Sequence, residues 1–110
     1  MNDPMKEAID SAKNCQQVCQ ETLEYCRSKG GDHADEAHLK LLEDCAKICE
    51  TAVDFMERGS TYHGQICGLC ADICEACAED CDKFEGDEQM QKCAEACRTC
   101  AEHCRAMSNM

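Results

Sequence analysis

The 110-residue chain has no tryptophan, a single proline, and only two phenylalanines and two tyrosines. Leucine, isoleucine, valine and phenylalanine together contribute just 13 residues. So few large apolar side chains, with a net charge of -12, are typical of a disordered chain unless other residues fill the interior. The chain contains 14 cysteines, however, so cysteine, alanine and methionine are the residues available to build a core.

Positive charge is also scarce, with 11 lysines and arginines against 23 aspartates and glutamates. Nucleic-acid binding needs clustered basic side chains, so this balance argues against a nucleic-acid partner. The N-terminal segment MNDPMKEAID has neither a basic region nor an apolar run, as a secretory signal would. No stretch approaches the roughly 18 consecutive apolar residues of a membrane span. These features predict a cytoplasmic protein without membrane contact, in which thiols stay reduced.

Three breaks interrupt the chain, each containing glycine, at 28–35, 57–64 and 84–89. They leave four segments of helical length, at about 4–28, 35–58, 61–84 and 87–107. Short connections make successive helices antiparallel neighbours. The chain is therefore predicted to be all-α, an antiparallel up-down-up-down four-helix bundle formed by residues 1–110 as a single domain.

Residues at the starts of these segments are typical of helix caps. Pro4 suits a first helical turn that follows an Asp3 cap. Asp87 is expected to cap the last segment, and Ser60 or Thr61 the third.

The cysteines follow the period of the helices. In HGQICGLCADICEACAEDC (63–81) they are 3, 4, 3 and 4 residues apart, which keeps every thiol on one stripe of one helix. One heptad register per segment places all the cysteines at a or d positions, where only about two in seven residues would fall by chance. The bundle is therefore predicted to have a cysteine-lined core, formed by Cys15, Cys19, Cys26, Cys45, Cys49, Cys67, Cys70, Cys74, Cys77, Cys81, Cys93, Cys97, Cys100 and Cys104. Conventional apolar residues flank this seam at Val18, Leu23, Tyr25, Leu39, Leu41, Ile48, Val53, Phe55, Ile66 and Ile73.

A core of cysteine has three explanations that do not involve a metal. Buried cysteine can act as a small hydrophobe, but 14 of them offer much less apolar area than leucine would. A secreted disulfide scaffold would also have an even number of cysteines, although these cysteines are not in loops. Disulfides between neighbours on one helix are disfavoured, because the two side chains cannot reach the required dihedral without bending the backbone.

Metal binding explains the pattern better. Thiolates select soft ions, namely copper(I), zinc and iron–sulfur clusters. Zinc prefers one isolated tetrahedral site, and the C-x₂-C-x₂-C-x₃-C-P run of iron–sulfur proteins is absent. Copper(I) accepts two or three thiolates, so a continuous ladder favours several copper(I) ions per chain, from about seven to one per cysteine by ligand counting. Each ion that enters should displace protons from the thiols.

The two ends of the predicted channel differ in their other ligands. One end collects Met5, Met56, His63, Cys67, Cys104 and Met107, and the opposite end collects Cys26, His38, Cys81, Phe84, Met90 and Cys93. Thioethers and imidazole exchange copper more readily than thiolates do. We therefore expect the first end to be the entry, with Met56, His63 and Met107 as additional ligands. His33 and His103 are expected to face solvent.

The run HGQICGLCADICEACAEDC, followed by CAEACRTCAEHC, resembles the cysteine-rich four-helix-bundle copper storage proteins of bacteria. The resemblance covers nearly the whole chain, including CQQVC and CAKIC in the first two segments. It implies that the 14 cysteines bind many copper(I) ions inside the bundle, that the protein is commonly a homotetramer, and that members without a leader are cytosolic. Four seam positions depart from a fuller cysteine ladder, which implies a lower capacity in the first two segments: Ala12, Thr22, Leu42 and Ala52.

Other functions remain open. No Ser/His/Asp set, phosphate loop or carboxylate pair indicates an enzyme. A redox protein could carry an iron–sulfur cluster or use the C-x₂-C pairs, although the strand-and-helix context of thioredoxin is missing. A zinc buffer or a zinc-stabilised interaction module is the third alternative. Oligomerisation is plausible because a sulfur-filled interior has little apolar area, and a partner subunit could bury Leu39, Val53 and Phe55.

Overall fold

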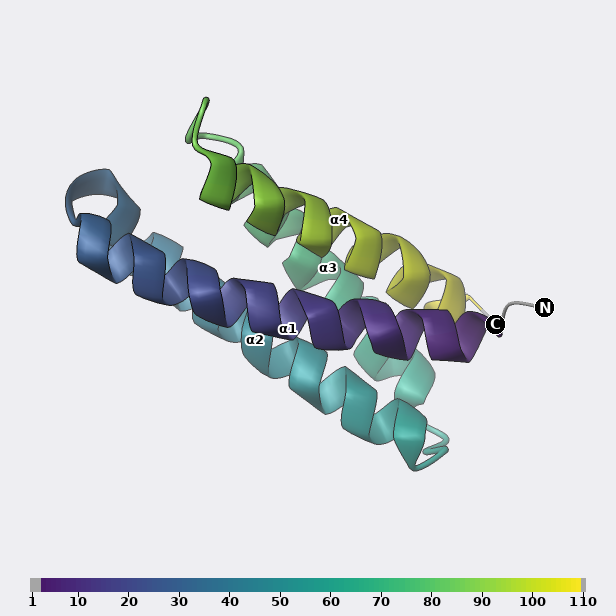
Figure 1. Cartoon of the computed structure of the whole chain (residues 1–110). Helices are drawn as coiled ribbons and strands as arrows, with labels where there is room; N and C mark the ends of the chain where they lie inside the picture. Colours follow the sequence, from purple (N-terminus) through teal and green to yellow (C-terminus); the bar gives the residue numbers. More distant parts are fainter. Residues whose placement is uncertain (1–2, 110) are drawn as a thin grey trace.

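The computed structural model describes residues 3–109, so Met1, Asn2 and Met110 of the predicted 1–110 domain lie outside the described part. Within 3–109 the chain is helical and contains no strand (Figure 1). The α-helices are α1 (Pro4–Lys29), α2 (Glu36–Glu57), α3 (His63–Cys81) and α4 (Glu88–Ser108). A short 3₁₀-helix, η1 (Gly31–Ala34), precedes α2.

The four helices form one bundle around a shared axis. Helix α1 packs against α2 and α4, and α3 packs against the same two helices, so each helix has two neighbours. Successive helices run in opposite directions, and the N- and C-termini lie at the same end (Figure 1). The predicted up-down-up-down four-helix bundle is confirmed. We call the end with the two termini and the α2–α3 connection the terminal end, and the end with the other two connections the loop end.

Two of the predicted helix caps are confirmed. The Asp3 carboxylate accepts a hydrogen bond from the backbone nitrogen of Met5 at 3.0 Å. The Asp87 carboxylate accepts from the backbone nitrogens of Gln89 and Met90 at 3.1 and 3.2 Å. Each carboxylate satisfies donors that the first helical turn leaves without a partner.

Helix α3 is shorter than the predicted 61–84, and the prediction that Ser60 or Thr61 caps it is wrong. Tyr62 occupies the cap position and makes no side-chain cap. The Ser60 hydroxyl instead accepts a hydrogen bond from the backbone nitrogen of Tyr62 at 3.1 Å. Ser60 therefore stabilises the turn that leads into the helix.

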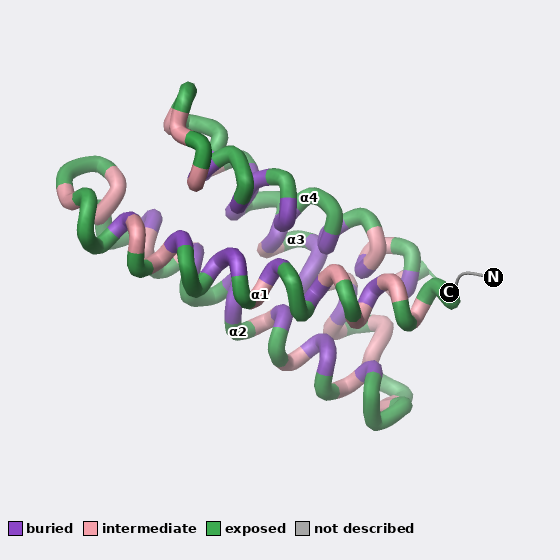
Figure 2. The backbone as a smooth tube through the Cα atoms, viewed as in Figure 1, coloured by how far each residue is buried: buried purple, intermediate pink, exposed green. Residues whose placement is uncertain are grey.

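The core consists mainly of sulfur and methyl groups. All 14 cysteines are buried, with at most 1% of any of them exposed. Buried residues form an inward stripe on each helix, and exposed residues cover the outer faces (Figure 2). Val18 and Val53 are buried beside the cysteines, and most of the other predicted flanking residues pack partly buried against them. None of the described helices has the length and hydropathy to cross a bilayer.

Candidate metal centre

All 14 cysteines lie among the described residues, and every one is a free thiol. Their sulfurs meet on the bundle axis, where atoms from different helices approach closely. The Sγ atoms of Cys45 and Cys74 are 3.6 Å apart, and those of Cys15 and Cys97 are 3.7 Å apart. The predicted cysteine-lined core is therefore confirmed. The cysteines form no disulfide bonds, so the structure is not a disulfide scaffold.

The sulfurs form four overlapping groups, in each of which all Sγ atoms lie within 4.8 Å of one another. From the terminal end toward the loop end, the groups are Cys70–Cys100–Cys104, Cys15–Cys49–Cys74–Cys100, Cys15–Cys19–Cys45–Cys97 and Cys19–Cys77–Cys93–Cys97. Adjacent groups share Cys100, then Cys15, then Cys19 and Cys97. The groups therefore form a continuous ladder of shared sulfurs, which we call the sulfur ladder.

Three cysteines lie outside these groups. Cys67 is one turn before Cys70 at the terminal end of α3, and Cys81 is one turn after Cys77 at the other end of the same helix. Cys26 lies near the C-terminal end of α1, two turns beyond Cys19. All three are fully buried, so they extend the sulfur-lined interior beyond the ladder at both ends.

Burial disfavours the charged form of the thiols in the ladder, but hydrogen bonds between the thiols shift their pKa values in both directions. The pKa is lowered for Cys15, Cys45, Cys70 and Cys93 and raised for others. Hydrogen bonds with Cys100 and other nearby thiols, together with burial, raise the pKa of Cys74. The same two causes, beginning with the hydrogen bond to Cys15, raise the pKa of Cys97. A protonated thiol is not a metal ligand, so each cation that enters must displace protons. The positive charge of the ion then compensates the buried thiolates.

Alkaline solution is expected to destabilise the metal-free protein. Burial raises the pKa of Cys26 from its ordinary 9.0 to about 11. Between these pH values the unfolded chain loses this proton while the folded chain keeps it, so the free energy of unfolding falls as the pH rises from 9 to 11. At about 1.4 kcal/mol per pKa unit, Cys26 alone accounts for a loss of up to about 3 kcal/mol.

Guanidinium unfolding with a phosphine reductant at pH 7.5, 9, 10 and 11 measures this loss. The variant Cys26→Ala is the matched control, because it keeps every other titrating group. It should lose less stability over the same range than the unsubstituted protein. Equal losses in the two proteins would contradict the assignment to this thiol.

The terminal end holds the three predicted ligands other than cysteine. Met56 and Met107 are buried, with 2% and 5% of their surface exposed. His63 is half-buried at the first position of α3, and its Nδ1–H donates a hydrogen bond to the Ser60 carbonyl oxygen at 2.8 Å. This hydrogen bond leaves Nε2 as the unprotonated nitrogen of the neutral ring. Coordination of copper by these three residues stays a prediction.

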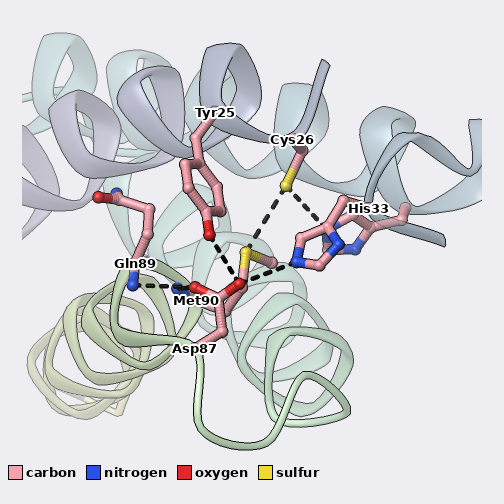
Figure 3. A network of polar contacts seen from close by, with 7 residues as sticks. Tyr25, Cys26, His33, Asp87, Gln89 and Met90 are labelled. Atoms are coloured by element: carbon pink, nitrogen blue, oxygen red, sulfur yellow. Dashed lines mark hydrogen bonds and ion pairs between the residues drawn. The ribbon is translucent and has the colours of Figure 1, made fainter. Parts of the chain in front are cut away.

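The loop end holds a set of polar and sulfur contacts that sequence reasoning did not recognise as a site. The Cys26 thiol donates a hydrogen bond to the Met90 sulfur at 3.6 Å (Figure 3). The Cys26 sulfur also lies 3.5 Å from Nε2 of His38. The other ring nitrogen of His38, Nδ1, is hydrogen-bonded to the Asp80 carboxylate. Although burial raises the pKa of Asp80, hydrogen bonds with Lys83 and His38 hold it below its usual range. The sequence feature that could have revealed this site is the position of His38 and Met90 on the inward seam of their helices.

The expectation that His33 and His103 face solvent is wrong, because both are half-buried and bonded. Nε2 of His33 lies 2.9 Å from the Asp87 carboxylate, which also accepts a hydrogen bond from the Tyr25 hydroxyl at 2.8 Å (Figure 3). This network ties the α1–α2 connection to the start of α4. The ring of His103, in α4, bonds to two residues of α1, Ser11 and Glu7. Both histidines therefore connect separate elements of the bundle, and their bonding partners are oxygen atoms and not sulfur atoms.

The family model for the copper storage protein, Csp, matches residues 1–109 of the chain. The chain belongs to the copper storage protein family. The predicted resemblance to the copper storage proteins is therefore confirmed.

Similar proteins include a curated relative and several solved structures. An uncharacterized cysteine-rich protein of Bacillus subtilis (strain 168), YhjQ, is 38% identical over 79 residues, which cover 72% of this chain and 73% of the relative. The crystal structure of Nmul_A1745 from Nitrosospira multiformis matches with a TM-score of 0.91 and 39% identity, over 96% of this chain and 95% of the other.

The Cu(I)-bound copper storage protein BsCsp3 matches with a TM-score of 0.89 and 38% identity, over 96% of this chain and 99% of that protein. Metal-free Csp3 from Bacillus subtilis matches with a TM-score of 0.83 and 37% identity, over 94% and 97% of the two chains. A copper storage protein thus has the same fold with and without copper(I). These matches favour copper over the redox and zinc alternatives.

Proposed function

We propose that this chain stores copper(I), binding several ions inside the bundle through cysteine thiolates. The sulfur ladder is the observation that carries the proposal, because soft thiolates from all four helices converge on one axis and share sulfurs between groups. The full set of 14 cysteines provides the sites, with Met56, His63 and Met107 as further ligands at the terminal end. Residues 1–110 act as one metal-binding domain.

The sharing of sulfurs distinguishes copper from zinc. Zinc takes four ligands in a closed tetrahedron. Of the three four-sulfur groups, only Cys15–Cys49–Cys74–Cys100 and Cys19–Cys77–Cys93–Cys97 have no member in common, so these groups provide two independent zinc sites. Copper(I) needs only two or three sulfurs, and a shared sulfur can bridge two ions. The ladder therefore holds more copper(I) than zinc.

Anaerobic titration of the reduced protein with copper(I), in competition with a chromophoric chelator, tests the proposal. We expect saturation at about seven or more ions per chain, since two cysteines per ion is the lowest ligand demand on 14 cysteines without bridging. Proton release, followed with a weakly buffered indicator, should accompany uptake because each thiol must lose its proton to bind copper(I). Saturation at zero or one ion would refute storage, and saturation at two would favour zinc-like sites.

The proposal also includes the cellular setting. Copper binding requires the thiols to be reduced, and all of them are free in the structure. A cytoplasmic location fits this requirement, because thiols are kept reduced there. The role is sequestration without catalysis, and the partners are metal ions and further copies of the chain.

We include a homotetramer in the proposal because the family resemblance implies it, and the outer face of α3 offers an apolar surface for association. Tyr62, Ile66, Leu69 and Ile73 lie at i, i+4, i+7 and i+11, so they share one side of the helix. Tyr62 is 64% exposed and Leu69 is 48% exposed. By contrast, Val53, which was predicted to be available to a partner, is already buried within the bundle.

Association of copies of the chain through this face can be tested with a substitution at its centre. Leu69→Glu places a charge in the centre of the apolar stripe, so we expect sedimentation velocity to show a smaller species than for the unsubstituted protein. Gln91→Glu adds the same charge at an exposed position of α4 and serves as the control. An unchanged sedimentation coefficient for Leu69→Glu would contradict the role of this face.

A further inference from the structure

The loop end brings three soft donor atoms together from three different helices. Cys26 belongs to α1, His38 to α2 and Met90 to α4. Cys26 and Met90 have no exposed surface, and His38 is 5% exposed. Seven residues of helix, or about 10 Å, separate Cys26 from Cys19, and Thr22 lies between them. None of the three residues belongs to the four groups of the sulfur ladder, so they form a further cluster beside it.

The ring of His38 is oriented for a metal ligand. The Asp80 carboxylate accepts a hydrogen bond from Nδ1–H, which fixes the tautomer and leaves the lone pair of Nε2 facing Cys26. Metal-binding histidines characteristically donate their other ring nitrogen to a carboxylate in this way, because the bond orients the ring and increases its basicity. Lys83 in turn holds the Asp80 carboxylate with an ion pair at 2.8 Å. The ring of Phe84 lies 5.1 Å from that of His38 and covers it.

The spacing of the donors suits a three-coordinate ion. Bonds of about 2.3 Å to sulfur and about 2.0 Å to nitrogen place a sulfur and a nitrogen of a trigonal site about 3.7 Å apart and two sulfurs about 4.0 Å apart. The observed distances from the Cys26 sulfur are 3.5 Å to Nε2 of His38 and 3.6 Å to the Met90 sulfur. Thiolate and thioether together select copper(I), and imidazole completes a set that zinc, which does not use thioethers, would not take.

A surface pocket borders this cluster at His38. It has a volume of about 310 Å³ and is lined by Asp32, Asp35, His38, Asp80, Lys83 and Phe84. Three carboxylates face one ammonium group there, so the pocket favours cations. His38 belongs to both the pocket wall and the cluster, so its ring is the point at which an ion in the pocket would first contact the cluster.

We propose that Cys26, His38 and Met90 form a mixed thiolate–imidazole–thioether copper(I) site at the loop end, oriented by Asp80 and reached through the acidic pocket. The inference rests on the proposed function, because it names an additional site for the same ion. It also places an accessible copper site at the end opposite to the one that the sequence favoured. The first ion to reach the interior by this route meets an imidazole before it meets the ladder.

Nuclear magnetic resonance of the unsubstituted, ¹⁵N-histidine-labelled protein tests the site without any change to the fold. Copper(I) has a closed d shell, so it does not broaden signals by paramagnetism. During anaerobic loading we expect the Nε2 resonance of His38 to shift while Nδ1 stays protonated, and the signals of His33 to keep their positions. Comparison with His38→Gln assigns the resonance.

A second measurement counts the ions. The double variant His38→Gln with Met90→Leu keeps the side-chain volumes similar and removes two of the three donors. It should bind one copper(I) fewer than the unsubstituted protein, whereas His33→Gln, at the same end but bonded to Asp87, should bind the full number. An unmoved Nε2 resonance at full loading, an unchanged count in the double variant, or an equal loss in His33→Gln would each overturn the site. If the unsubstituted protein bound no copper, storage itself would fail, whereas several bound ions with a silent His38 would remove this site alone.

Discussion

Copper(I) loading is expected to move the guanidinium midpoint of the reduced protein to a much higher concentration. An ion that binds only the folded chain stabilises it by about 4 kcal/mol when free copper(I) is a thousandfold above the dissociation constant of the site. The sulfur ladder joins all four helices, so two or three such ions would add as much as the whole stability of an ordinary domain, about 5–15 kcal/mol.

Circular dichroism of the helices, recorded anaerobically with and without copper(I), measures this shift. The metal-free interior is built from small side chains, with Leu42 as the largest fully buried residue, so its own contribution should be modest. Removal of the metal with a high-affinity chelator is the control and should return the midpoint to its original value. A midpoint that is the same before and after loading would show that the ions do not cross-link the helices.

Removal of a shared sulfur is expected to cost more capacity than removal of a peripheral one. Cys97 belongs to two groups of the ladder, together with Cys15, Cys19, Cys45, Cys77 and Cys93, and its Sγ is 3.7 to 3.8 Å from three of these sulfurs. Cys97→Ala should therefore lose about two or more copper(I) ions, because each ion needs two or three sulfurs in reach.

Cys67→Ala is the matched control. Like Cys97, Cys67 is fully buried on the inward cysteine stripe of its helix, but it belongs to none of the four groups. It should lose about one ion at most, by the same ligand demand. Alanine is compatible with the helix at both positions, so the helical circular dichroism of the two metal-free variants should match. Equal capacities in the two variants would contradict bridging by shared sulfurs.

The sequence predicted the cysteine stripe because a 3-4 spacing has only one structural meaning on a helix. Once Cys67, Cys70 and Cys74 share a face, burial of that face against the other helices brings the sulfurs together. The identity of the groups was not predictable in the same way. That Cys15 meets both Cys97 and Cys100 depends on the relative axial positions of α1 and α4, which packing determines and heptads do not.

The loop end shows most clearly which contacts could not be predicted from the sequence. Asp80 is on the outer side of the cysteine stripe in sequence, yet the end of α3 places it against His38 of α2. Helix α3 also ends earlier than its pattern suggests, since the backbone nitrogens of Lys83 and Phe84 already bond the carbonyls of Asp80 and Cys81 in tight turns. His33 turns inward because η1 folds back on Asp87. The contacts of His38 with Asp80 and of His33 with Asp87 join residues far apart in the chain, so local patterns contain no trace of them.

The closeness of the sulfurs has a consequence for the protein when no metal is bound. Cys15 and Cys97, on different helices, need to approach by less than about 2 Å to reach disulfide bond length. An oxidant that takes two electrons and two protons from such a pair would join α1 to α4 covalently and remove two donors from the axis. Thiol reductants in the surrounding medium therefore determine how much of the interior is open to copper at any moment.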